Sequence, residues 1–159
     1  MFKYATLGGL KHEKNNPRTK ATQELLNGMV VLPDDVTGNA PTPANAEEAK
    51  VAEFVVNNII DKPEIRNSAD FKIEVGEYVH ADQLPSVDGL LVQIDEKVVT
   101  TKYTDVAIND VLVSAADGSG QWIKADGEAV IAEDYKMNLV VKAKTTYGGN
   151  GFDALVKAN

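Results

Sequence analysis

The stretch FKIEVGEYV, residues 71–79, contains two short strand patterns separated by a glycine. In its first half three apolar residues alternate with Lys72 and Glu74, and this two-residue period is typical of a strand with one buried face. Gly76 can adopt backbone conformations that redirect the chain, so a second strand is expected over residues 77–80. The stretch therefore predicts β structure interrupted by a turn.

Similar patterns recur on both sides of this stretch. About nine strand-like segments follow one another at intervals close to the 8–12 residues that are typical of all-β sandwiches and barrels. Small polar or glycine-containing turns separate them, which favours antiparallel pairing. The sequence therefore predicts a mainly β fold, an antiparallel β-sandwich or small β-barrel with an extended N-terminal arm and little helix. The segments are 52–57, 71–75, 77–80, 90–94, 98–103, 106–115, 121–124, 139–144 and 152–156, with 90–94 and 98–103 expected to form a hairpin.

Three regions follow from this pattern. Residues 51–159 are expected to form the antiparallel β domain, and residues 28–50 a short strand, a Pro-containing loop and a helical turn over 46–50. Residues 1–27 are expected to form an extended basic arm. Within them, 21–27 fits either two turns of helix or a turn into a strand.

The charge is distributed unevenly between these regions. The chain of 159 residues has a formal net charge of −8, yet residues 1–20 carry five basic side chains and one acidic side chain, which leaves −12 on the remaining 139. An acidic body repels nucleic-acid phosphates, so nucleic acid is not expected to be the main target. The apolar runs of the sequence are too short for a transmembrane helix or a signal peptide. We therefore expect synthesis in the cytoplasm and no membrane partner.

The N-terminal segment mixes apolar and basic residues in a way that suits a chain docking on another protein. Twenty extended residues reach about 66 Å at ~3.3 Å each, far enough to cross to a neighbouring subunit. Pairing with the edge of the protein's own sheet and disorder remain as alternatives. We expect deletion of residues 1–20 to leave a folded body that no longer binds its partner. The expected partner-binding residues are Phe2, Lys3, Tyr4, Lys11, Lys14, Arg18 and Lys20.

Evidence for a catalytic or metal site is weak. The chain has no cysteine, and His12-Glu13 lacks the second histidine, at position 16, of a zinc-protease helix. His80 has no nucleophile in a recognisable motif, so a surface or partly buried structural histidine is expected. We therefore expect a non-enzymatic protein with no cofactor and no metal site.

Acidic pairs occur at the predicted turns, for example Asp34-Asp35 and Asp126 with Glu128. Aspartate at such positions supports the turn by accepting hydrogen bonds from nearby backbone N–H groups. Turn stabilisation is therefore the preferred interpretation. A calcium site in a loop and a glycosidase-type acid pair remain as alternatives.

The aromatic residues allow a second functional class. Trp122 is the only tryptophan and is expected in the core. If some aromatic side chains were exposed instead, they would form a stacking platform, and the protein would be a carbohydrate- or ligand-binding β-sandwich module. The candidates for this platform are Tyr78, Tyr103, Trp122 and Tyr147.

Three segments carry a family resemblance: Gly28-Met29-Val30-Val31, Val55-Val56-Asn57-Asn58 and, above all, residues 71–79. Together with the arm and the series of short strands, they resemble small virion proteins of tailed bacteriophages, namely capsid decoration (cement) proteins and head-fibre bases. The resemblance implies a non-enzymatic structural protein, a homo-oligomer on the capsid surface of the virion. Its implied partners are the major capsid protein and neighbouring copies of itself, and its implied function is to stabilise the assembled shell.

Overall fold

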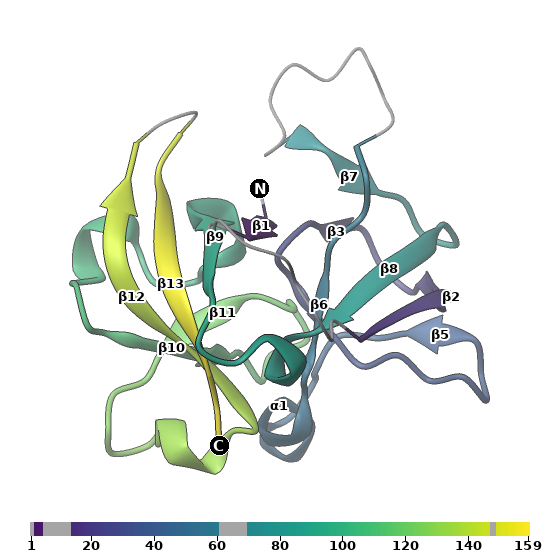
Figure 1. The fold of residues 1–159 in the computed structure, drawn as a ribbon. Coiled ribbons are helices and arrows are strands. Elements are labelled where there is room, and N and C mark those ends of the chain that lie inside the picture. Colours follow the sequence, from purple (N-terminus) through teal and green to yellow (C-terminus); the bar gives the residue numbers. More distant parts are fainter. Residues whose placement is uncertain (1, 5–13, 61–69, 147–148) are drawn as a thin grey trace.

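The computed structural model describes residues 2–4, 14–60, 70–146 and 149–159. Within this part of the chain, two main β-sheets lie side by side, with one short α-helix at the base of the molecule in the view of Figure 1. The strands are β1 (Phe2–Tyr4), β2 (Asn15–Ala21), β3 (Leu25–Leu26), β4 (Val30–Val31), β5 (Asn39–Ala40), β6 (Phe54–Val56), β7 (Lys72–Ile73), β8 (Tyr78–Gln83), β9 (Leu91–Asp95), β10 (Val111–Ser114), β11 (Trp122–Lys124), β12 (Met137–Thr145) and β13 (Gly151–Ala158). The helix is α1 (Ala46–Val51), and the 3₁₀ turns are η2 (Leu84–Val87), η3 (Glu96–Val98), η4 (Tyr103–Asp105) and η5 (Ala132–Asp134).

The larger sheet has six antiparallel strands in the order β1-β9-β13-β12-β10-β11. Its longest pairing is the β12–β13 hairpin, which continues beyond the rest of the sheet (Figure 1). The sheet curls, and a bridge between Val99 and Trp122 joins the segment that follows β9 to the outer strand β11. This contact covers an edge that would otherwise present unpaired backbone groups.

The second sheet has five strands in the order β4-β6-β8-β2-β5, and β3 pairs with β7 in a separate two-stranded ribbon. All pairings in it are antiparallel except that of β2 with β5. Strand β2 lies between β8 and β5, so it is an internal strand of this sheet.

Two hydrophobic cores share the strands of the second sheet. Val30 and Val55 face the core that lines the curled six-stranded sheet, together with Trp122 and Phe152. The adjacent residues, Val31 and Val56, point to the opposite face and pack with the β3–β7 ribbon. Successive side chains of a strand alternate between faces, so the five-stranded sheet lies between the two cores.

The mainly β prediction with little helix is confirmed. The predicted helical turn at 46–50 is α1, whose N-terminus is capped by Asn45: its side chain accepts a 3.0 Å hydrogen bond from the Glu48 backbone N–H. Residues 25–26 form a strand, so the strand alternative for 21–27 is correct and the helix alternative is wrong.

The N-terminal segment differs from the expected free arm. Phe2 is only 5% exposed, because its strand pairs with β9 and its ring enters the larger core. Thr19, Ala21 and Leu25 are also buried, and β2 is inside a sheet. The described part of residues 1–27 thus follows the intramolecular alternative, since its apolar residues are needed to complete the protein's own cores.

Two further expectations are corrected. Residues 98–103 do not form a hairpin with β9; the chain turns at η3 and η4 instead, and β9 pairs with β1 and β13. Val75 is exposed rather than buried, because the chain reverses in a turn closed by the hydrogen bond from Glu77 N–H to Glu74 O. Only the first part of the 71–75 pattern is therefore a buried strand.

The turn role of the aspartates is confirmed at several positions. Asp34 accepts hydrogen bonds from the Val36 backbone and the Thr37 hydroxyl, at 2.9 and 2.8 Å. Asp126 accepts from two backbone N–H groups, at 2.9 and 2.8 Å. These hydrogen bonds lower the pKa of both carboxyls, that of Asp34 chiefly through Thr37 and that of Asp126 chiefly through Val130.

Candidate binding site on the face of strand β8

An open hollow of about 380 Å³ lies on the five-stranded sheet. It is lined by Pro17 of β2, by Tyr78 and His80 of β8, and by Asn58 and Ile59, which follow β6. The three elements are neighbours in the sheet order, so hydrogen-bonded strands hold the walls of the hollow in place. Its volume is at the lower end of the range of small-molecule pockets, roughly 300–1,000 Å³.

The strand period explains which side chains reach this hollow. Val79 and Ala81 point into the core shared with the β3–β7 ribbon. Tyr78 and His80, two residues apart, therefore share the opposite face. Pro17 lies where the pairing of β2 with β8 shifts register, between Asn16 and Thr19, a position that does not need a backbone N–H for the ladder.

Asn58 is a polar lining residue of the hollow and is held by four hydrogen bonds. Its backbone N–H donates to Asn27 Oδ1 and its carbonyl accepts from Asn27 Nδ2, both at 2.8 Å. Its side chain donates to the Tyr78 carbonyl at 2.9 Å and accepts from the His80 backbone N–H at 2.7 Å. Both ends of the side-chain amide are thus bound to the backbone of β8, which fixes the position of this strand relative to the segment after β6.

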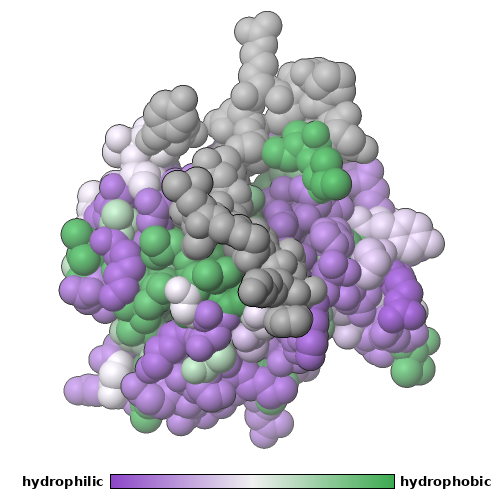
Figure 2. Space-filling model, in the orientation of Figure 1, coloured by the Kyte–Doolittle hydropathy of each residue, from purple (hydrophilic) through white to green (hydrophobic). Residues whose placement is uncertain are grey.

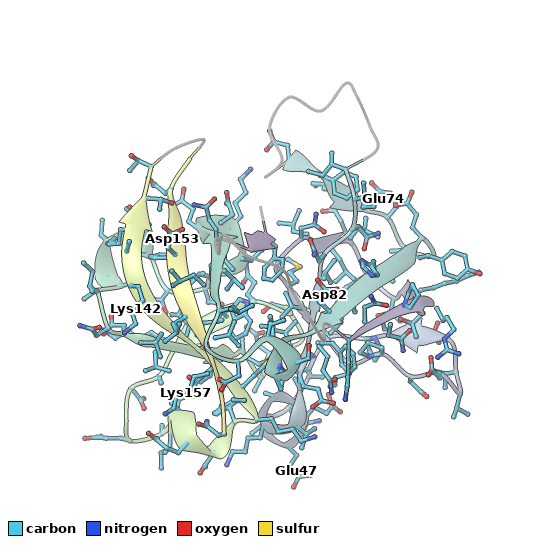
Figure 3. The ribbon with its side chains drawn as sticks, viewed as in Figure 1. Glu47, Glu74, Asp82, Lys142, Asp153 and Lys157 are labelled. Carbon is cyan, nitrogen blue, oxygen red and sulfur yellow. The ribbon has the colours of Figure 1, made fainter. Side chains whose placement is uncertain are left out.

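A second network lies next to the first and includes a buried carboxylate. Asn57 Nδ2 donates to Asp82 Oδ2 at 2.7 Å, and the Asp82 side chain is fully buried. Figure 3 labels Asp82 near the centre of the view, on β8. A buried charge is costly unless it is hydrogen bonded, so Asn57 is a structural partner of this carboxylate.

His80 connects this network to the surface. Its Nδ1 lies 3.2 Å from the carbonyl oxygen of Asn57, which can only accept a hydrogen bond. Its Nε2 lies 3.9 Å from Asp82 Oδ1, beyond hydrogen-bond distance. The side chain is 36% exposed, as expected for a partly buried structural histidine.

The rim of the hollow is apolar and aromatic. Tyr78 is 62% exposed and Ile59 is 84% exposed. The Lys20 ammonium group lies 5.2 Å from the centre of the Tyr78 ring, a cation–π distance. In Figure 2 the visible face of the molecule is largely hydrophilic, and hydrophobic side chains gather in separate areas of it.

The residues expected to bind a partner do not all lie on the surface. Phe2 is buried, whereas Lys14, Arg18 and Lys20 are exposed on or beside β2. Arg18 lies 3.6 Å from Asp35. Lys3 and Tyr4 pair with β9 through their backbones, and Lys11 lies outside the described residues.

Of the four aromatic residues that were candidates for a stacking platform, the described part of the structure shows one with a largely exposed side chain. Trp122 is fully buried, which confirms its predicted place in the core, and Tyr103 packs against Phe152 with ring centres 5.2 Å apart. Tyr147 lies outside the described residues. Tyr78 is thus the candidate whose exposure matches the expectation.

The sequence did not single out Pro17, Asn58 or Ile59 as site residues. Their contribution depends on the order β6-β8-β2, which joins strands far apart in the chain. The pair Asn57-Asn58, directly after an apolar run, was the available signal, because two amides at a strand end are well suited to bind backbone groups of a neighbouring strand.

The five lining residues include one imidazole, that of His80, and no serine, threonine, cysteine or carboxylate side chain. Among the described residues, no group of three or more histidine, aspartate or glutamate side chains could hold a metal ion. None of the helices in the same part of the chain is long and apolar enough to cross a membrane.

Comparison of the chain with protein-family models, with curated proteins and with solved structures finds no match. Functional inference therefore depends on the geometry of the surface and on the sequence.

Proposed function

We propose that the protein is a non-enzymatic virion structural protein that attaches to the outer surface of an assembled phage capsid and stabilises it. The family resemblance of the sequence suggests the capsid as partner. The observation that supports attachment is that the exposed Lys20 of β2 lies over the exposed aromatic ring of Tyr78, while Lys14 and Arg18 are exposed on or beside the same strand. Arginine and tyrosine are enriched at protein interfaces, and lysine stems cover apolar surface.

Electrostatics favour an acidic partner for this surface. The chain is acidic overall, but Lys14, Arg18 and Lys20 place three positive charges within seven consecutive residues on and beside β2. Charge complementarity directs association and sets orientation more than it adds affinity. On a symmetric shell, many copies of such a contact give firm attachment even where one contact is weak.

The test is co-sedimentation of the purified protein with capsid shells of the virus that encodes it. The triple variant Lys14→Glu, Arg18→Glu, Lys20→Glu should lose most of its binding, because each change replaces an attraction by a repulsion. All three side chains are exposed, so the variant should keep its fold. Circular dichroism and the melting temperature check this.

A matched control reverses three exposed lysines elsewhere: Lys102→Glu, Lys142→Glu and Lys157→Glu. Lys142 and Lys157 lie on the other main sheet (Figure 3). The control should bind as the unchanged protein does. Equal loss in both triple variants would mean that net charge, and not the β2 surface, governs binding. No sedimentation of the unchanged protein with shells would contradict the capsid proposal itself.

A further inference from the structure

We infer that the hollow lined by Pro17, Asn58, Ile59, Tyr78 and His80 is a carbohydrate subsite that binds one pyranose ring against the side chain of Tyr78. This inference goes beyond capsid attachment and does not depend on it. It requires an apolar surface for the C–H face of a sugar and polar groups at its edge for the hydroxyls.

The apolar requirement is met by Tyr78 and its neighbours. The tyrosine ring keeps most of its surface exposed, and Ile59 and Pro17 extend the apolar surface on either side of it. A sugar ring covering these groups removes their carbon atoms from water, which is the main favourable contribution at such a site.

The polar requirement is met by the side chains of His80 and Lys20. His80 lines the hollow with a side chain that is 36% exposed, so its imidazole ring can form a hydrogen bond with a sugar hydroxyl. The Lys20 ammonium group, 5.2 Å from the centre of the Tyr78 ring, can donate to hydroxyl oxygens at the edge of a stacked sugar. Hydroxyl groups both donate and accept, so one pyranose can satisfy the two groups together.

The framework is held in place before any ligand binds. The Asn58 amide joins the Tyr78 carbonyl to the His80 backbone N–H, so the two lining residues of β8 keep their spacing. The Asn27 hydrogen bonds hold Asn58 in turn. A pre-organised site loses less conformational entropy on binding, which matters most for weak ligands such as single sugars.

A sugar fits these features better than an apolar side chain of a protein partner. The hollow is open and combines its apolar rim with a half-exposed histidine and a lysine, whereas a protein anchor residue is normally enclosed in a desolvated pocket. An open, partly polar site is more favourable for a ring whose edge remains in water.

The experiment is a titration of the ¹⁵N-labelled protein, followed by NMR, with cellotriose, lactose and chitotriose at millimolar concentrations. At least one sugar should shift the amide signals of residues 58–59 and 78–80, and saturation transfer should be strongest to the C–H protons of one ring face. Tyr78→Ala should weaken binding roughly tenfold, since a stacked aromatic contact of this kind contributes about one order of magnitude. Tyr78→Phe keeps the ring and should bind as the unchanged protein does.

Ile108→Ala is the matched control, because Ile108 is also an exposed apolar side chain but lies in the turn before β10. It should leave binding unchanged. The inference is overturned if none of the three sugars shifts these signals, or if Tyr78→Ala binds sugar unchanged. It is also overturned if N-acetyl-leucinamide shifts the same signals while the sugars do not, because the hollow would then be a protein-anchor site.

Discussion

The indole N–H of Trp122 donates a 2.8 Å hydrogen bond to the backbone carbonyl of Gly28, 94 residues earlier in the chain. The donor lies on the outer strand of the six-stranded sheet, and the acceptor lies two residues before β4 of the other sheet. One buried side chain thus joins the two main sheets.

Replacement of this side chain should be costly. Trp122→Phe removes the indole N–H, so the buried Gly28 carbonyl loses this hydrogen bond. The smaller phenylalanine ring also leaves a small cavity in the core. We expect a loss of about 2–4 kcal/mol in the free energy of unfolding, measured by urea denaturation. Tyr78→Phe, at an exposed position, should change this value by less than about 0.5 kcal/mol. A Trp122→Phe variant as stable as the unchanged protein would mean that the hydrogen bond contributes nothing.

A glycine beside this contact is required for steric reasons. Gly120 has a φ of +72°, and a Cβ atom there would lie 2.6 Å from Thr42 Cγ2 and 3.0 Å from the Val30 carbonyl oxygen. Gly120→Ala should therefore cost about 2–4 kcal/mol of stability. Gly118 has a similar φ of +79° with nothing near its missing Cβ, so Gly118→Ala should cost only about 1 kcal/mol. Equal melting temperatures for the two variants would show that crowding at Gly120 is not important.

The turn aspartates predict the response to acid. The pKa of Asp117 is lowered chiefly by hydrogen bonds from Ser119, and that of Asp126 by hydrogen bonds from Val130 and Glu128. A carboxyl whose pKa is lower in the folded state stabilises the fold above its unfolded pKa, and this contribution is lost as the pH falls through the folded value. Stability should thus be nearly constant from neutral pH to about pH 5 and fall below about pH 4.

The pH dependence is measured by thermal unfolding between pH 7 and pH 2. The double variant Asp117→Asn, Asp126→Asn should show a shallower fall below pH 4, because neutral amides no longer titrate. An unchanged profile in the double variant would assign the acid sensitivity to other carboxyls.

The place of β2 predicts the result of truncation. Deleting residues 1–20 removes β1 and most of β2, exposes the edges of β5 and β8, and takes Phe2 and Thr19 out of the interior. We expect the truncated protein to be unfolded or aggregated, as judged by circular dichroism and size-exclusion chromatography. A monodisperse truncated protein with an unchanged melting temperature would restore the free-arm interpretation. Charge reversal on β2 is therefore a better test of partner binding than truncation.

Local patterns predicted the strands well where the strand neighbours follow each other in sequence. The β12–β13 and β10–β11 hairpins each consist of two apolar runs joined by a turn rich in small residues, and both were expected as strands. The candidate site could not be derived in the same way. Asn58 and Tyr78 meet only because β6 pairs with β8, and no local period records this pairing.

For residues 14–20 the structure differs from the arm interpretation for a different reason. Basic side chains at Lys14, Arg18 and Lys20 make residues 14–20 polar, and the single inward-facing side chain at Thr19 is not hydrophobic. An internal strand with charged groups on one face and a bulge at Pro17 lacks the alternation that identifies a half-buried strand. The internal position of β2 results from the order of the strands in the sheet, and the residue types of β2 do not indicate it.

The adjacent pairs Val30-Val31 and Val55-Val56 have one last consequence. Each pair supplies one side chain to each of the two cores. A slip of one residue in either strand would therefore send every inward side chain to the wrong core, and both cores would lose their fit at once. The same four valines thus fix the register of β4 and β6 through both cores. A strand that is misaligned at one core also packs poorly at the other.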